Sequence, residues 1–319
     1  MRIVTALTIG FEQVSRCCAN LPDIELINTE SEDDIVRAIP DADALFIFGS
    51  RYSAEVARVV GVANIAWIHL ITAGIDPLRR FPPPADVVVS SGGRVWASAV
   101  AEHALSLLLA ICHGLHYAER ARVDREWRRA FFIESMQVLR EMPVLVVGFG
   151  AIGQNIVRLL TGFGARISVI ARSSRVCDGV QVYAPKDVID LLPAHDAIVV
   201  TLPFTHSTKN MINEKILREC KSGTILINVS RGGVIDETAM MDALRDGRLG
   251  GAGLDVFQDE PLPQDHPLWQ FDNVVLTPHV AGFGDTVALE EMAQVCRENL
   301  IDFLGNKAPR DQIAFDQRR

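Results

Sequence analysis

Three polar segments in the second half of the chain carry side chains that suit the reduction of a carbonyl group next to a carboxylate. Each follows a short apolar run: Asn228-Val229-Ser230-Arg231-Gly232, Leu254-Asp255-Val256-Phe257 through Glu260-Pro261, and Thr277-Pro278-His279-Val280-Ala281-Gly282. The fork of Arg231 can bind a carboxylate or a polarised carbonyl. Histidine is the natural proton donor near neutral pH, and a carboxylate beside it orients the ring. Arg231, Glu260 and His279 are therefore the candidate catalytic residues, although a single histidine at a strand end is more often structural.

A glycine-rich motif in the middle of the chain predicts the second reactant. The apolar run 144–147 is followed at once by Gly148-Phe149-Gly150-Ala151-Ile152-Gly153 and then by a helical pattern. In a dinucleotide site the first glycine makes the tight turn, the second lets the backbone approach the pyrophosphate, and the third lets helix and strand pack closely. The helix N-terminus then faces the phosphates. The alternative is a glycine-rich turn in an ordinary α/β domain, but the strand–turn–helix context favours the dinucleotide site.

The segment after the second strand of this series indicates which dinucleotide is preferred. A NAD-specific site carries an acidic residue here to hold the ribose hydroxyls. This chain has Arg172, Ser173 and Arg175 instead. Arginine can hold a 2′-phosphate through charge-assisted hydrogen bonds. The sequence therefore predicts that NADP(H) is preferred and NAD(H) is possible, with a solvated basic turn as the alternative.

The elements that must position these residues form two α/β series. Apolar runs at 3–7, 24–28, 44–48, 65–70 and 87–90 alternate with helical patterns, and a second series runs through 144–147, 166–170, 197–201, 224–228, 253–256 and 274–277. Such alternation predicts parallel sheets covered by helices on both faces. Between the series, 98–122 is expected to form one long helix. A further helix is expected over 285–304, ended by Gly305. The fold class is thus α/β with two Rossmann-like or flavodoxin-like domains, and the cleft between them is the expected ligand site.

Composition narrows the class of protein. The chain has 319 residues, a net charge of −9, 49% hydrophobic and 22% charged residues, which fits two globular domains. The absence of a basic run argues against nucleic acid or an anionic membrane as partner. The first seven residues read as a buried strand rather than a secretory signal, and no apolar run is expected to span a membrane. Six scattered cysteines form no C-x-x-C motif, so no metal site is expected. We expect these cysteines to be reduced thiols and the protein to be cytoplasmic.

Together these motifs resemble the D-isomer-specific 2-hydroxyacid dehydrogenase family. The resemblance covers nearly the whole chain and includes two further segments, Thr72-Ala73-Gly74-Ile75-Asp76 and Val100-Ala101-Glu102-His103. It implies a discontinuous substrate-binding (catalytic) domain over 1–97 and 286–319, with a dinucleotide-binding domain over 98–285.

The resemblance also implies a role for each residue. Arg231 would bind the substrate carboxylate and polarise the keto oxygen, and His279 would donate the proton as hydride arrives. Glu260 would keep His279 protonated. The substrate carboxylate would be held by backbone N–H groups of a loop that contains Thr72, Ala73 and Gly74. Asp255 would hold the nicotinamide amide. The other implied cofactor-binding residues are Gly148, Gly150, Ala151, Ile152, Gly153, Arg172, Ser173, Arg175, Leu202, Pro203, Thr208, Val229, Ser230 and Gly282.

The basic turn points to the NADPH-dependent glyoxylate/hydroxypyruvate reductase branch, so the expected reaction converts a small 2-ketoacid to a D-2-hydroxy acid. Larger ketoacids stay open. Gly282-Phe283-Gly284-Asp285 differs from the commoner Gly-Ala-Thr pattern after the histidine, so Phe283 can shape the pocket, and Trp96 near the crossing between the domains can do the same. A different class is a nucleotide-sensing interaction protein like the corepressors of this fold. Formate dehydrogenase, with glutamine in place of Glu260, is disfavoured. A homodimer through the long helix is expected, with a monomeric core as the alternative, and no C-terminal regulatory domain is expected.

Overall fold

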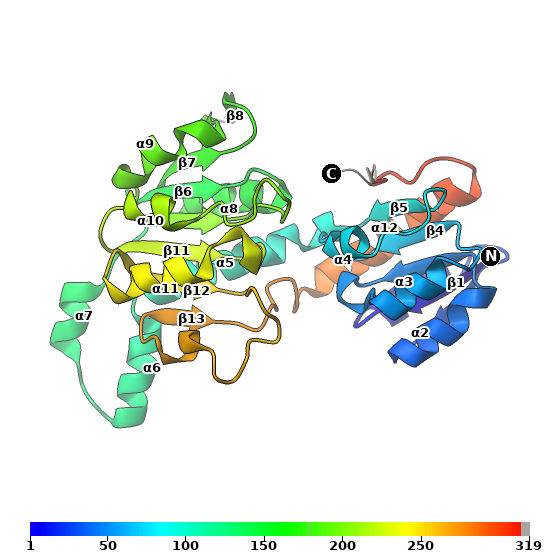
Figure 1. The fold of residues 1–319 in the computed structure, drawn as a ribbon, viewed down its shortest axis with the longest axis horizontal. Helices are drawn as coiled ribbons and strands as arrows, with labels where there is room; N and C mark the ends of the chain where they lie inside the picture. The colour runs from blue at the N-terminus through cyan, green and yellow to red at the C-terminus, as the bar shows by residue number, and fades with distance from the viewer. Residues whose placement is uncertain (178, 314–319) are drawn as a thin grey trace. The chain divides into compact units, whose positions relative to one another are not determined.

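The computed structural model describes residues 1–177 and 179–313. Two compact units divide the chain (Figure 1). Unit 1 contains Met1–Trp96 and the segment that begins at Gly284, and unit 2 contains Ala97–Phe283. Both are α/β, as the alternation of strand and helix patterns predicts.

Unit 1 is built on a five-stranded parallel sheet in the order β2-β1-β3-β4-β5, which is the flavodoxin-like order. Its strands are β1 (Arg2–Ala6), β2 (Glu25–Asn28), β3 (Ala44–Ile47), β4 (Trp67–Leu70) and β5 (Val88–Ser91). Its helices are α1 (Phe11–Cys18), α2 (Glu32–Ala38), α3 (Ala54–Val60), α4 (Asp76–Arg80) and α12 (Thr286–Leu304). Side chains of β1 alternate between two cores, with Val4 in one and Ile3 in the other. Asp285 caps α12 by accepting from the N–H groups of Val287 and Ala288, which confirms the predicted helix start.

Unit 2 is built on an eight-stranded sheet in the order β13-β12-β11-β10-β6-β7-β9-β8. Its strands are β6 (Pro143–Val147), β7 (Arg166–Ile170), β8 (Arg175–Cys177), β9 (Val180–Tyr183), β10 (Ala197–Val200), β11 (Thr224–Asn228), β12 (Leu249–Leu254) and β13 (Val274–Leu276). Its helices are α5 (Ala97–Cys112), α6 (Leu115–Asp124), α7 (Arg129–Ser135), α8 (Ala151–Gly162), α9 (Val188–Leu191), α10 (Glu214–Arg218) and α11 (Glu237–Arg245). The strands β9-β7-β6-β10-β11-β12 take the dinucleotide-binding order, with β6 and β10 side by side at the point where the order reverses. All six predicted strands are present, but β9 was not predicted, and the predicted strand 274–277 is β13, which lies beyond β12.

Helices cover both faces of the unit 2 sheet. Leu145 and Val147 of β6 pack into a core with side chains from α9, α10 and α11. Val144 and Val146 pack on the opposite face with side chains from α5 and α8. This alternation along one strand explains why the run reads as continuously apolar.

The structure corrects two expected elements. The helix expected over 98–122 breaks at Gly114, which has a φ of 63° and separates α5 from α6. Glycine adopts this left-handed conformation without a Cβ penalty, while the apolar spacing continues across the break and hides it. The basic turn after β7 is also shorter than expected, because Arg175 begins β8, an exposed antiparallel strand without an apolar pattern.

The expectation that no apolar run reaches membrane-spanning length is also corrected. Gly93–Cys112 is a helical stretch of 20 residues with a mean hydropathy of 1.7, long and apolar enough by length and composition alone. A single helix of this kind is weak evidence of a membrane span. Most of it is α5, whose Ala101, Leu105 and Leu108 are buried in the unit 2 core. Packing inside the unit accounts for the apolar character of those positions.

Candidate active site

The glycine loop between β6 and α8 has the geometry that a pyrophosphate requires. Gly148 has a φ of 114°, and a Cβ there would lie 2.5 Å from the Thr201 hydroxyl. A Cβ on Gly153 would lie 2.2 Å from the carbonyl oxygen of Gly148, so only glycine lets the helix approach the turn. Gly150 caps α8 without a side-chain hydrogen bond, and a Cβ there would meet nothing within 4 Å. The loop therefore leaves open backbone and uncapped N–H groups at the helix start, and it fits a dinucleotide phosphate.

Basic side chains lie next to this loop. Arg172, Ser173 and Arg175 are all exposed after β7. The Arg175 guanidinium lies 5.7 Å from the ring centre of Phe149, the residue between the first two glycines. It also donates to the Ser173 hydroxyl at 3.3 Å. The arrangement places one exposed cation, Arg175, beside the glycine loop.

Arg231 stands on a turn that is fixed from both sides. The buried Asn228 accepts hydrogen bonds from the N–H and hydroxyl of Ser230 through Oδ1, and donates to the Arg231 carbonyl through Nδ2. Arg231 donates from Nη1 to the carbonyl of Ser230 at 2.6 Å. A Cβ on Gly232 would lie 1.9 Å from the carbonyl carbon of Phe257. The Arg231 turn is thus packed directly on the backbone that leads to Glu260.

His279 and Glu260 form a hydrogen-bonded pair. Nδ1 of His279 donates to Oε2 of Glu260 at 2.6 Å, and Oε1 of Glu260 accepts from the Phe257 N–H at 2.9 Å. Burial would raise the pKa of Glu260, but the bonds from His279 and Phe257 and the charges of His279 and Arg231 hold it below its ordinary value. Glu260 is therefore an anion at neutral pH. Because Nδ1 faces this anion, Nε2 is the nitrogen left to hold a transferable proton.

Asp255 is buried at the end of β12 and organises the turn that follows β13. Its oxygens accept from the Thr277 hydroxyl at 2.6 Å and from the N–H groups of Val280 and Ala281 at 2.9 and 3.0 Å. These bonds and a contact with His103 hold its pKa below the ordinary value against the opposing effect of burial. These donors and the contact with His103 take up the acceptor positions of a side chain that is 1% exposed, and the nicotinamide role expected for Asp255 stays a prediction from the sequence.

The remaining predicted residues lie on two loops and one turn. In the loop after β10, the Thr208 hydroxyl donates to the carbonyl of Pro203 at 2.6 Å, which closes the segment that begins at Leu202. Val229 is buried beside Ser230, and Gly282 follows Ala281 near the end of unit 2. The cofactor role of these residues stays a prediction from the sequence.

The loop Thr72–Gly74 belongs to unit 1. The Thr72 hydroxyl accepts from the Gly49 N–H at 3.1 Å, and the Thr72 carbonyl accepts from the Ser91 hydroxyl at 2.9 Å. A Cβ on Gly93 would lie 2.0 Å from the Ala73 nitrogen, so this loop is packed against the start of the crossing to unit 2. The structure thus brings Arg231, Glu260 and His279 together in unit 2 and holds the Thr72–Gly74 loop separately within unit 1.

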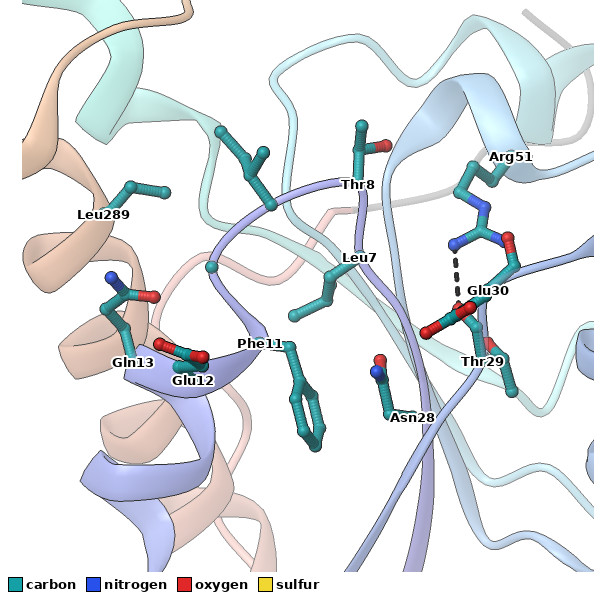
Figure 2. A pocket seen from close by; sticks show the side chains of 12 residues that line it. Leu7, Thr8, Phe11, Glu12, Gln13, Asn28, Thr29, Glu30, Arg51 and Leu289 are labelled. Atoms are coloured by element: carbon teal, nitrogen blue, oxygen red, sulfur yellow. Dashed lines mark hydrogen bonds between the residues drawn. The ribbon is translucent and has the colours of Figure 1, made fainter.

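Unit 1 also contains an open cavity of about 800 Å³ at the ends of β1 and β2 (Figure 2). Figure 2 shows Arg51 bonded to the carbonyl of Thr29 beside Glu30, with Glu12 across the cavity. No residue predicted from the sequence lines it. In the described part of the chain, no group of three His, Cys, Asp or Glu side chains is placed to hold a metal ion.

Comparison with known proteins identifies the family. The sequence model described as "D-isomer specific 2-hydroxyacid dehydrogenase, NAD binding domain" matches residues 105–281. Glyoxylate reductase of Thermococcus kodakarensis is 36% identical over 286 residues, which cover 86% of this chain and 84% of the relative. The chain belongs to the D-isomer-specific 2-hydroxyacid dehydrogenases.

Solved structures agree with this membership. A family member from Aeromonas salmonicida superimposes with a TM-score of 0.86 at 29% identity over 99% of both chains. A second, from Xanthobacter autotrophicus in complex with NADPH and MES, superimposes with a TM-score of 0.80 at 25% identity, covering 100% of this chain and 98% of that chain. As a family member the chain is an NAD(P)-dependent oxidoreductase that reduces a 2-ketoacid, and these relatives do not support the corepressor alternative.

Sequence reasoning missed the residues that hold this family's reactive groups in place. Asn228 acts locally, through hydrogen bonds to Ser230 and Arg231, whereas His103 contacts Thr277 across 174 positions of the chain. All three residues lie inside the quoted segments, so their positions were a usable signal. The pairing of His103 with Thr277, in contrast, depends on the tertiary fold.

Proposed function

We propose that this protein uses NADPH to reduce a small 2-ketoacid, such as glyoxylate or hydroxypyruvate, to the 2-hydroxy acid, which has the D configuration wherever C2 of the product is chiral. The observation that carries the proposal is the 2.6 Å hydrogen bond between His279 and the Glu260 carboxylate, close enough to Arg231 for its charge to lower the pKa of Glu260. Acid, orienting carboxylate and cation are the groups that carbonyl reduction beside a carboxylate needs.

Each side chain has one task in this reaction. The bound NADPH supplies a hydride to the keto carbon. Arg231 holds the substrate carboxylate and polarises the keto oxygen. His279 gives its Nε2 proton to that oxygen and becomes neutral, while Glu260 stays ionised and holds Nδ1. The N–H groups of the Thr72–Gly74 loop keep the substrate-binding role predicted from the sequence, which makes unit 1 the substrate-binding domain and unit 2 the dinucleotide-binding domain in this proposal.

The substrate class is supported by relatives rather than by a feature of the pocket. Glyoxylate reductases from several archaea are 31 to 36% identical to this chain. The alignment covers 94% of this chain for the Thermofilum pendens protein and 86% for the Thermococcus kodakarensis protein. We assay the purified chain with NADPH or NADH and a panel of 2-ketoacids, following loss of reduced-nicotinamide absorbance. NADPH oxidation with glyoxylate or hydroxypyruvate supports the proposal, whereas tight nucleotide binding without turnover of any ketoacid contradicts it.

The preference for NADPH is assigned to Arg172, Ser173 and Arg175. For the double variant Arg172→Ala/Arg175→Ala we expect the KM for NADPH to rise about 30-fold. The estimate assigns about 1 kcal/mol of binding free energy to each exposed charge contact with the 2′-phosphate. The KM for NADH should stay within twofold. Arg158→Ala is the control, because Arg158 is an exposed arginine on α8. Equal KM values for the two cofactors in the unsubstituted protein would rule out the phosphate role.

A homodimer is assigned to the surface of α6 and α7. Large apolar side chains are exposed there, among them Leu115 at 56%, Trp127 at 90% and Met136 at 46%. A groove of about 640 Å³ crosses this surface and is lined almost wholly by apolar atoms, from residues that include Leu115, Phe132 and Met136. Exposed apolar patches of this kind mark protein contacts. We propose that the occupant is the same surface of a second copy.

Light scattering during size exclusion tests the dimer. We expect the mass of two 35.0 kDa chains for the unsubstituted protein and of one chain for Leu115→Asp/Met136→Asp. Val62→Asp is the control, because Val62 is exposed at 82% in unit 1, and it should leave the dimer intact. A single-chain mass for the unsubstituted protein across micromolar concentrations would exclude this assembly. The cytoplasmic location stays a prediction from the sequence.

A further inference from the structure

His103 on α5 has no task in the reaction just proposed, but it begins a chain of hydrogen bonds that ends beside His279. Its Nε2 lies 2.9 Å from the Thr277 hydroxyl oxygen, and that hydroxyl donates to Oδ1 of Asp255 at 2.6 Å. A hydroxyl has one proton, so Thr277 must accept from His103, and Nε2 of His103 therefore carries a proton.

The far end of the chain holds the backbone just after the proton donor. Asp255 accepts from the N–H groups of Val280 and Ala281, the two residues that follow His279. His279 itself has a φ of 54°, the left-handed region that non-glycine residues rarely adopt. Such a conformation persists only where neighbouring contacts enforce it. Asp255 supplies two of those contacts.

The Asp255 carboxylate is buried, so it depends on the hydrogen-bond donors around it, including Thr277 and His103. The side chain of Asp255 is 1% exposed and that of His103 is 23% exposed. A buried carboxylate is stable only where donors surround it. His103 lies 3.5 Å from Oδ1 of Asp255 and lowers its pKa, as Thr277 and the two N–H groups do. Loss of His103 would free the Thr277 hydroxyl to rotate and weaken the hold of Asp255 on the turn.

We propose that His103 is a positioning residue that, through Thr277 and Asp255, fixes the turn on which His279 donates its proton. The inference rests on the proposed function, because it explains how that function's proton donor is placed. It assigns His103 no contact with substrate or cofactor. Its effect should therefore fall on the chemical step and leave NADPH binding unchanged.

Two replacements of His103 separate the hydrogen bond from packing. In His103→Gln the amide nitrogen can take the place of Nε2 and still donate to Thr277. In His103→Asn the amide nitrogen takes the place of Nδ1 and cannot reach the Thr277 hydroxyl. We expect kcat for ketoacid reduction to fall about 10- to 100-fold in His103→Asn and to recover to within about threefold in His103→Gln. The KM and Kd for NADPH should stay within twofold in both.

Substitution of Thr277 tests the middle of the chain. Thr277→Val should lose kcat as His103→Asn does, and Thr277→Ser should retain it. The double variant His103→Asn/Thr277→Val should lose no more than either single variant, because all three break one network. If the fold-losses of kcat in the two single variants multiply in the double variant, His103 and Thr277 do not act through one network.

A measurement without turnover keeps this inference distinct from the proposed reaction. Amide hydrogen exchange at Val280 and Ala281 should accelerate in His103→Asn and Thr277→Val and stay protected in His103→Gln, at equal global stability in urea. Unchanged protection in His103→Asn overturns the inference whether or not the protein reduces a ketoacid. A wild-type kcat in His103→Asn, or a loss of NADPH affinity in step with kcat, overturns it as well. If the unsubstituted protein reduces no ketoacid while the exchange pattern holds, the proposed function fails and the positioning of the turn stands.

Discussion

Arg231→Ala is expected to lose about 10²–10³ in kcat, and more in kcat/KM, for reduction of a 2-ketoacid. The guanidinium is assigned to both the substrate carboxylate and the keto oxygen, so its removal weakens ground-state binding and the stabilisation of developing charge. NADPH binding should be unaffected. Steady-state rates with varied ketoacid and saturating NADPH give both constants.

Two controls show whether the fork or only the charge of Arg231 is needed. Arg231→Lys keeps the charge but loses the paired donors, so its kcat should lie between those of Arg231→Ala and the unsubstituted enzyme. Arg218→Ala removes an exposed arginine that pairs with Glu214 on α10, and it should be indistinguishable from the unsubstituted enzyme. Turnover of Arg231→Ala within threefold of normal would remove this residue from the reaction.

His279→Asn is the second large effect, with an expected loss of about 10²–10⁴ in the rate of reduction. Asparagine tolerates the left-handed backbone at this position, whose φ is 54°, better than alanine does. The variant therefore removes the proton donor while keeping the turn. The Kd for NADPH, measured by fluorescence titration, should change by less than twofold. A parallel collapse of cofactor binding would make His279 a structural residue.

Glu260→Gln tests the partner of His279 through pH. In the unsubstituted enzyme Nδ1 of His279 donates to the Glu260 carboxylate at 2.6 Å, and this bond helps to hold the pKa of Glu260 below its ordinary value against the opposing effect of burial. Protonation of this carboxylate at low pH removes the acceptor that orients His279, so the rate of reduction should fall on the acid side. Glutamine does not titrate, so this acid-side fall should be absent in the variant. An acid-side fall of the same shape in Glu260→Gln would separate Glu260 from the orientation of His279.

The parts of the site predicted from sequence are those whose chemistry is local. The glycine loop combines a tight turn and a close helix within six residues, and the structure places Gly148 and Gly153 in that geometry. Arg231 and His279 could be grouped because the carboxyl ends of neighbouring parallel strands share one edge of a sheet.

The parts that sequence reasoning missed depend on contacts between distant segments. The bond between His103 and Thr277 joins residues 174 positions apart. His103 lies in a segment that carries the family resemblance, but the spacing of that segment does not indicate which residue it contacts. Gly114 breaks the long helix because its φ is 63°, while the apolar pattern runs on across it. The strand that begins at Arg175 is three residues long and carries no apolar alternation.

Transfer of deuterium tests the central claim most directly. We incubate the protein with hydroxypyruvate and NADPH that carries deuterium on both C4 positions of the nicotinamide, and analyse the product by NMR and on a chiral column. The account predicts D-glycerate with one deuterium on C2, made at a rate that falls by at least about 100-fold in His279→Asn and in Arg231→Ala. Unlabelled product, the L-isomer, or an unchanged rate in those variants would contradict it.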